Sequence, residues 1–182
     1  MLDRRQFIKQ SVALSGCLLL PACRRSPHAR LYRTFSPEEA GCLIALCEQV
    51  IPADDTPGAT DAGVIFYIDT TVARYFPETV SRYKTGIASL QTYCLREHGS
   101  SFETLAQSVQ TDIMKRMDTG DFPSEDGWEG VSPKSFMSML TEHTMQGFYG
   151  PPRHGGNRNY ASYRMLKLDF PLVVGQNRYG NG

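Results

Sequence analysis

The chain has 182 residues, with 19 basic side chains, 19 acidic side chains and a formal net charge of zero. Six of the basic residues but only one acidic residue lie in the first thirty positions, so the remaining chain has 13 basic and 18 acidic residues, a net of −5. A remainder of about 150 residues is large enough for one hydrophobic core. Its acidic balance lacks the clustered basic surface that nucleic-acid binding needs, so we exclude nucleic acid as a partner.

The first thirty residues have the pattern of a twin-arginine export signal. An arginine pair is followed by apolar and basic residues and then by an apolar run over residues 11–20. The residues that form the signal motif are Arg4, Arg5, Phe7, Ile8 and Lys9. The run is too short to cross a membrane, which takes roughly 20 apolar residues. We therefore expect residues 1–30 to direct the folded chain through the twin-arginine translocase to the periplasm. A short N-terminal helix of the folded protein is the alternative.

The end of this signal has two interpretations. Leu20-Pro21-Ala22-Cys23 resembles a lipobox, in which Cys23 would be lipidated and become the mature N-terminus. A single lipid group would add membrane affinity without making the chain integral to the membrane. Ordinary cleavage after Ala22 or Ala29 is the other interpretation.

Residues 31–182 are expected to form one all-α domain of about five helices, because apolar residues recur there at three- and four-residue steps. The first helix begins at Ser36, a suitable N-cap, and ends before Pro52. The second has Tyr75 and Phe76 on its apolar face. No convincing strand alternation is present apart from a short apolar run at 172–174. The expected helices cover residues 36–51, 62–76, 80–98, 102–117 and 132–148.

Three cysteines fall in the domain: Cys42, Cys47 and Cys94. Five residues on one helix separate the first two by a rise of about 7.5 Å, which is too far for an undistorted disulfide. One of them could bridge to Cys94, or all three could be buried thiols. A disulfide to a second chain is a third interpretation.

The segment after the last helix is irregular. Residues 147–156 are rich in glycine and proline, which predicts a loop with unusual backbone angles. Arg153, Arg158 and Arg164 are interleaved with aromatic side chains there, and these residue types are enriched at protein–protein interfaces. The same aromatic side chains could instead close the core of the domain.

No residue pattern in the sequence indicates catalysis. His98, His143 and His154 lack metal-ligand spacing, and the acidic residues Asp54, Asp55 and Asp61 do not follow the calcium-loop pattern. We expect all six to be surface or capping residues. No nucleophile motif is present either. The residues therefore predict no catalytic, cofactor or metal site in this chain.

Three stretches together resemble a known family. They are Ile51-Pro52-Ala53-Asp54, then Ala62-Gly63-Val64 with Tyr67-Ile68-Asp69, and Gly147-Phe148-Tyr149 followed by Pro152 and Gly155-Gly156-Asn157-Arg158. They are similar to the gluconate 2-dehydrogenase subunit 3 family, the small subunits of membrane-associated flavin-dependent sugar and sugar-acid dehydrogenases. Pro151, His154, Ser162-Tyr163 and Leu172 depart from the family pattern.

This resemblance implies a non-catalytic subunit that escorts and stabilises an FAD-dependent large subunit, which has no export signal of its own. A cytochrome c subunit commonly receives the electrons. FAD would then belong to the partner subunit. The motif region is expected to be structural or partner-facing; its residues are Phe148, Tyr149, Pro152, Arg153, Gly155, Gly156, Asn157, Arg158 and Tyr163.

Two other hypotheses remain. The chain could be an independent periplasmic lipoprotein that binds a small ligand, in which case the purified domain would carry a stoichiometric bound molecule. It could also be a small hydrolase or metalloenzyme that uses His143 or His154, and alanine substitution of either would then abolish activity.

Overall fold

A computed structural model describes residues 32–124 and 127–168 of the chain. The export signal predicted from Arg4, Arg5, Phe7, Ile8 and Lys9 lies outside the described residues, as do the lipidation site predicted at Cys23 and the apolar run at 172–174. The structural findings below concern the described residues alone.

The described residues form helices and contain no strand, which confirms the all-α prediction. None of these helices is long and apolar enough to cross a membrane. The longer elements are α2 (Pro37–Val50), α5 (Pro77–His98), α6 (Gln107–Thr119) and α7 (Pro133–Tyr149). The shorter ones are α3 (Val64–Phe66), η2 (Tyr67–Val72), α4 (Ala73–Tyr75), η3 (Phe102–Thr104), η4 (Pro152–His154), η5 (Arg158–Tyr160) and α8 (Ala161–Met165).

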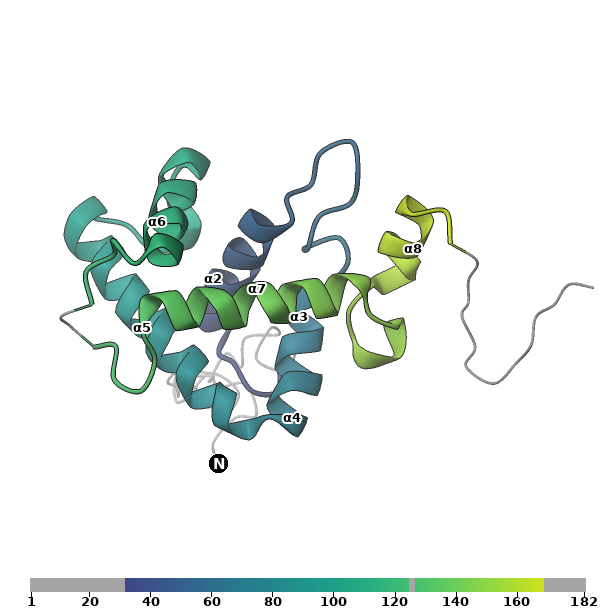
Figure 1. The fold of residues 1–182 in the computed structure, drawn as a ribbon, viewed down its shortest axis with the longest axis horizontal. Coiled ribbons are helices and arrows are strands. Elements are labelled where there is room, and N and C mark those ends of the chain that lie inside the picture. Colours follow the sequence, from purple (N-terminus) through teal and green to yellow (C-terminus); the bar gives the residue numbers. More distant parts are fainter. Residues whose placement is uncertain (1–31, 125–126, 169–182) are drawn as a thin grey trace, which may run out of the picture.

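Helix α7 is the centre of the fold. It runs across the middle of the molecule in Figure 1, with α6 near one of its ends and α8 near the other. It packs against α2, α3, α5, α6 and α8, so most of the core forms along its length. Its inward residues follow the predicted helical spacing and are all buried: Phe136, Met137, Leu140, Thr144 and Phe148.

The helix ends follow the local sequence signals. The side chain of Ser36 accepts a hydrogen bond from the Glu39 backbone, and Glu39 bonds back to the Ser36 backbone (2.8 Å), completing the capping box that opens α2. Helix α7 begins after Ser132, whose side chain accepts from the Ser135 amide. Helix α5 ends at Gly99, in the left-handed conformation (φ 69°) that glycine adopts without a Cβ penalty.

The second helix differs from its prediction in one respect. Its middle, η2, is a π-helical turn, which has more residues per turn than an α-helix. This turn shifts the following residues around the axis, so Tyr75 and Phe76 do not continue the apolar face. They are 64% and 48% exposed, and the prediction that they point inward is wrong.

The fourth predicted helix is interrupted. After η3, Leu105 and Ala106 are extended (ψ 155° and 143°), and α6 begins only at Gln107. Two glutamine side chains stabilise this break: Gln91 Oε1 accepts from the Phe102 amide, and Gln110 Nε2 donates to the Phe102 carbonyl, both at 2.8 Å. These bonds join residues up to 11 positions apart, which helical periodicity does not reveal.

The three cysteines of the described residues are buried thiols. Cys42, Cys47 and Cys94 form no disulfide with one another, so the predicted bridge to Cys94 is absent, and a disulfide to a second chain stays a prediction. Burial raises the pKa of Cys47 to about 12 and that of Cys94 to about 11. The Thr144 hydroxyl donates to Cys47 Sγ (3.3 Å), which only partly offsets the effect of burial on its pKa.

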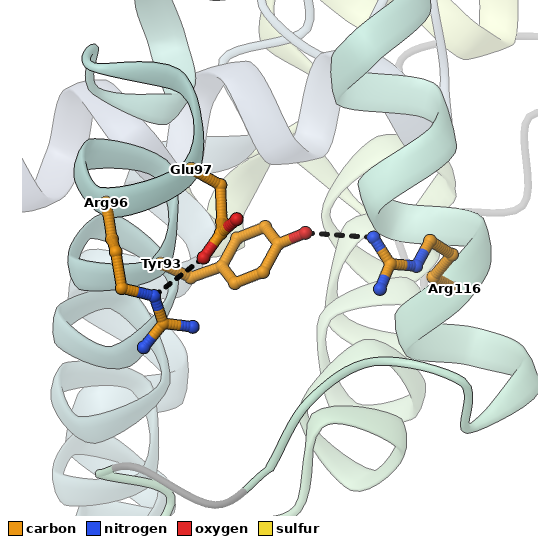
Figure 2. Close-up of polar contacts among 4 residues, drawn as sticks. All are labelled: Tyr93, Arg96, Glu97 and Arg116. Carbon is orange, nitrogen blue, oxygen red and sulfur yellow. Dashed lines mark hydrogen bonds and ion pairs between the residues drawn. The ribbon is translucent and has the colours of Figure 1, made fainter.

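A polar and aromatic cluster joins α6 to the last turns of α5 (Figure 2). Arg116 Nη1 donates to the Tyr93 hydroxyl (2.8 Å), and the rings of Tyr93 and Phe122 lie 4.4 Å apart. The nearby ion pair between Arg96 and Glu97 (2.7 Å) is exposed, so it contributes little to stability. Tyr93 thus contacts both Arg116 on α6 and Phe122, which follows that helix.

Candidate functional site

The motif loop, residues 147–163, starts where two glycines meet. Gly156 lies against the backbone of Gly147, and a Cβ at Gly156 would overlap the Gly147 carbonyl. Gly147 is itself packed against Tyr67 and Val64, where a Cβ would lie 3.1 Å from their side chains. The two glycines therefore allow the loop to fold back directly onto the last turns of α7.

Asn157 fixes the loop from inside. It is fully buried and left-handed (φ 45°), a conformation that asparagine tolerates better than most residues. Its Nδ2 donates to the Gly150 carbonyl (3.0 Å), and its Oδ1 accepts from the Ser162 amide (2.9 Å). One side chain thus joins the exit of α7 to the beginning of α8.

Arg158 holds the loop against the second helical segment. Its amide donates to the Ala62 carbonyl (2.9 Å), and its guanidinium lies 3.6 Å from the centre of the Phe66 ring, a close cation–π contact. Its aliphatic stem covers Gly63, where a Cβ would come within 2.5 Å of Arg158 Cδ. Gly63 and Arg158, almost a hundred residues apart, are therefore complementary in shape.

The turn between these contacts holds the remaining motif residues. Pro152 opens η4, and Arg153 Nε donates to His154 Nε2 (3.1 Å) at the surface. The Thr71 hydroxyl donates to the His154 carbonyl (2.7 Å), which attaches the turn to η2. Gly155 follows with φ 100°, so the expected unusual backbone angle is present.

The aromatic residues divide between core and surface. Phe148 and Tyr163 are buried, as expected for side chains that close the core. Tyr149 packs edge-on against Phe148 (4.9 Å between ring centres) but remains 39% exposed. Of the aromatic motif residues, Tyr149 is therefore the one with a large accessible surface.

An acidic loop adjoins this motif. Asp54, Asp55 and Asp61 border a hollow of about 630 Å³ together with Arg158 and Arg164. Hydrogen bonds from the Thr56 side chain and backbone lower the pKa of Asp54, and Asp61 accepts from the Gly58 amide (3.1 Å). Asp54 and Asp61 are turn-capping residues, as predicted.

The fold described above and the motif loop are both covered by one family model. The model for gluconate 2-dehydrogenase subunit 3 matches residues 37–169, well over half of the chain. The chain belongs to the gluconate 2-dehydrogenase subunit 3 family. A search of curated proteins and a search of solved structures found no match. Membership of the subunit 3 family indicates a component of a dehydrogenase complex that has other subunits.

In this subunit 3 chain, His143 is not the surface residue that we expected. It is buried on α7, and its Nδ1 lies 2.9 Å from the hydroxyl of buried Tyr83. Burial lowers the pKa of His143, although the nearby Glu142 carboxylate acts in the opposite direction. No group of three or more potential metal ligands is found in the described part of the chain.

Sequence reasoning missed two further polar residues of this subunit. Asp69 is buried within η2 and accepts three backbone hydrogen bonds from residues 33–35. Arg82 lies in a hollow beside α7, and its buried Nε has no hydrogen-bond partner. Asp69 could have been identified from the sequence, since a carboxylate within an apolar helical face needs a specific partner. Arg82 could not, because charged residues on exposed helix faces are common.

Proposed function

We propose that this chain is the non-catalytic small subunit of a periplasmic FAD-dependent dehydrogenase that oxidises gluconate or a related sugar or sugar acid. In this proposal it binds the flavoprotein large subunit in the cytoplasm, stabilises it and carries it through the twin-arginine translocase. A cytochrome c subunit is the proposed electron acceptor. FAD belongs to the large subunit.

The observation that supports this proposal most strongly is the family match over residues 37–169. The twin-arginine pattern at Arg4 and Arg5 adds to it, because this route exports proteins that have already folded. A flavoprotein that acquires FAD in the cytoplasm needs such a route, and a bound small subunit can supply the signal.

The roles of the motif residues also favour an accessory subunit. Gly156, Asn157 and Arg158 each make contacts that hold the loop against α3 and α7. These residues shape a surface instead of presenting reactive groups to a substrate. The proposal accordingly assigns the substrate and flavin chemistry to the partner.

The proposal is tested in the organism that produces the chain. Arg4 and Arg5 are both replaced by Lys, and the gluconate-oxidising flavoprotein is followed by cell fractionation. We expect it to remain in the cytoplasm together with this chain. Replacement of Arg24 and Arg25 by Lys is the matched control, since it changes a second arginine pair outside the signal motif. Normal export of the flavoprotein in the Arg4/Arg5 variant would refute the escort role.

A further inference from the structure

Two hollows adjoin along the outer face of α7. One, of about 410 Å³, has Tyr67, Met145 and Tyr149 in its wall; the other, of about 420 Å³, has Phe76, Arg82 and Glu142. Gln146 borders both, so they form one continuous surface, which we call the α7 groove. Its lining residues come mainly from α7 and from the segment where α4 meets α5, elements that Figure 1 labels.

The groove has large apolar side chains in contact with solvent. Phe76, Met145 and Tyr149 are 48%, 44% and 39% exposed. Glu142, Gln146 and Tyr149 lie on one side of α7 because they are spaced four and three residues apart. Tyr149 is the last residue of α7 and belongs to the motif loop, so the groove borders the segment with the most specific family resemblance.

A cation without a partner lies at the other end of this groove. The Nε of Arg82 is buried and has no hydrogen-bond partner, and Arg82 forms no ion pair with a described carboxylate. A buried donor without an acceptor destabilises the protein. An acceptor supplied from outside would remove this destabilisation.

The acidic residue that lines the groove, Glu142, already accepts a hydrogen bond. Glu142 Oε1 accepts from Gln146 Nε2 (3.0 Å), and Gln146 Oε1 accepts from the Tyr67 hydroxyl (2.8 Å). This chain of hydrogen bonds holds Glu142 toward Gln146. The groove therefore combines exposed apolar side chains with an arginine that lacks a carboxylate.

We propose that the α7 groove is the docking surface for the large subunit, and that it receives an Asp or Glu carboxylate on Arg82 between apolar side chains of that partner. The identity of the partner rests on the proposed function. The chemistry of the partner surface follows from the groove: arginine pairs with carboxylates through charge-assisted hydrogen bonds, and Arg, Met and aromatic residues are enriched where proteins bind each other.

The experiment uses the full chain, tagged at its C-terminus and produced in its own organism. Wild-type chain is expected to bring down an FAD-containing, gluconate-oxidising protein, whose dissociation constant is then measured with the purified partners. Arg82→Glu and Met145→Asp are each expected to weaken binding roughly tenfold or more. Met145 is exposed, so Met145→Asp tests the groove even if Arg82→Glu fails to fold.

Two matched variants control for charge and for loss of apolar surface. Lys84→Glu reverses a charge on the exposed side of α5, and Leu95→Asp removes an apolar side chain that is 57% exposed outside the groove. Both are expected to bind within about twofold of wild type. Weakening by the controls equal to that by the groove variants would overturn the proposal.

Other outcomes separate this proposal from the function on which it rests. If wild-type chain binds no flavoprotein, the proposed function fails. If it binds and the groove variants bind equally well, only the groove assignment fails. If the chain self-associates and Met145→Asp abolishes that association, a second copy of the chain occupies the α7 groove and the groove assignment is overturned. If free gluconate raises the thermal stability of wild type but not of Arg82→Gln, the groove is a small-anion site and the groove assignment is likewise overturned.

Discussion

Asp69 binds the segment containing Thr34 through both its side chain and its backbone. The Thr34 amide donates to Asp69 Oδ1 (2.8 Å), and the Thr34 hydroxyl donates to the Asp69 carbonyl (2.9 Å). The amides of Arg33 and Phe35 donate to the same carboxylate, at 2.7 and 3.2 Å. The first described residues are therefore attached to the π-helical turn η2 by one buried side chain.

Replacement of Asp69 by Ala should lower the free energy of unfolding by about 3 kcal/mol, because it removes the side-chain acceptor of three backbone amides and leaves those amides unpaired. Chemical denaturation measures this change. Hydrogen exchange at residues 33–35 should also become faster. Asp55→Ala, at an exposed position, is the control and should change stability by less than about 0.5 kcal/mol. Unchanged exchange at residues 33–35 would contradict the assigned role of Asp69.

Replacement of Gly156 by Ala should lower the free energy of unfolding by about 1–3 kcal/mol, because the new methyl group would overlap the Gly147 carbonyl and force the backbones apart. Thermal denaturation measures the loss. Gly41→Ala is the control: it lies within α2, with no atom within 4 Å of the added Cβ. There alanine should stabilise the protein by about 0.5–1 kcal/mol. Equal effects at the two positions would refute the assigned contact.

The sequence predicted helices well where local signals were complete. Ser36, Ser132 and Gly99 mark helix ends through interactions with their own neighbours, so their chemistry is visible in a short window. The π-helical turn at residues 67–72 depends on distant partners, including the backbone that Asp69 binds. The exposure of Tyr75 and Phe76 follows from that turn and was not predictable from helical periodicity.

The motif loop was predictable in kind but not in detail. Its glycines and prolines indicated special backbone angles, and Gly155 has one. The contact of Arg158 with Phe66 joins residues 92 positions apart, so no local pattern specifies it. The unpaired state of Arg82 depends in the same way on where α7 packs against α5, which only the three-dimensional structure defines.

The thiols of Cys42, Cys47 and Cys94 should resist modification in the folded protein, because all three are buried and burial raises their pKa values, to about 12 for Cys47. A disulfide reagent at pH 8 should label none of them until denaturant is added. A variant with Cys17 and Cys23 replaced by Ser leaves these three as the only thiols. Rapid labelling of the native variant would contradict the buried free-thiol assignment.

Protonation of His143 should destabilise the fold in acid. Burial lowers its pKa in the folded state below the ordinary 6.5, so the unfolded chain binds the proton more readily. Its contribution to stability is therefore complete above about pH 6.5 and is lost as the pH falls toward the folded-state pKa. The loss is at most about 1.4 kcal/mol per pH unit. Denaturant unfolding between pH 7.5 and 5 measures it.

The variant His143→Gln separates this residue from the carboxylates that also titrate in acid. Glutamine does not bind a proton in this range, so stability of the variant should fall less between pH 7.5 and 5 than that of wild type. Tyr83→Phe removes the hydroxyl that lies 2.9 Å from Nδ1 but keeps the buried imidazole. It should lower stability at every pH and retain the wild-type acid dependence. The same acid dependence in His143→Gln would show that other groups cause the loss.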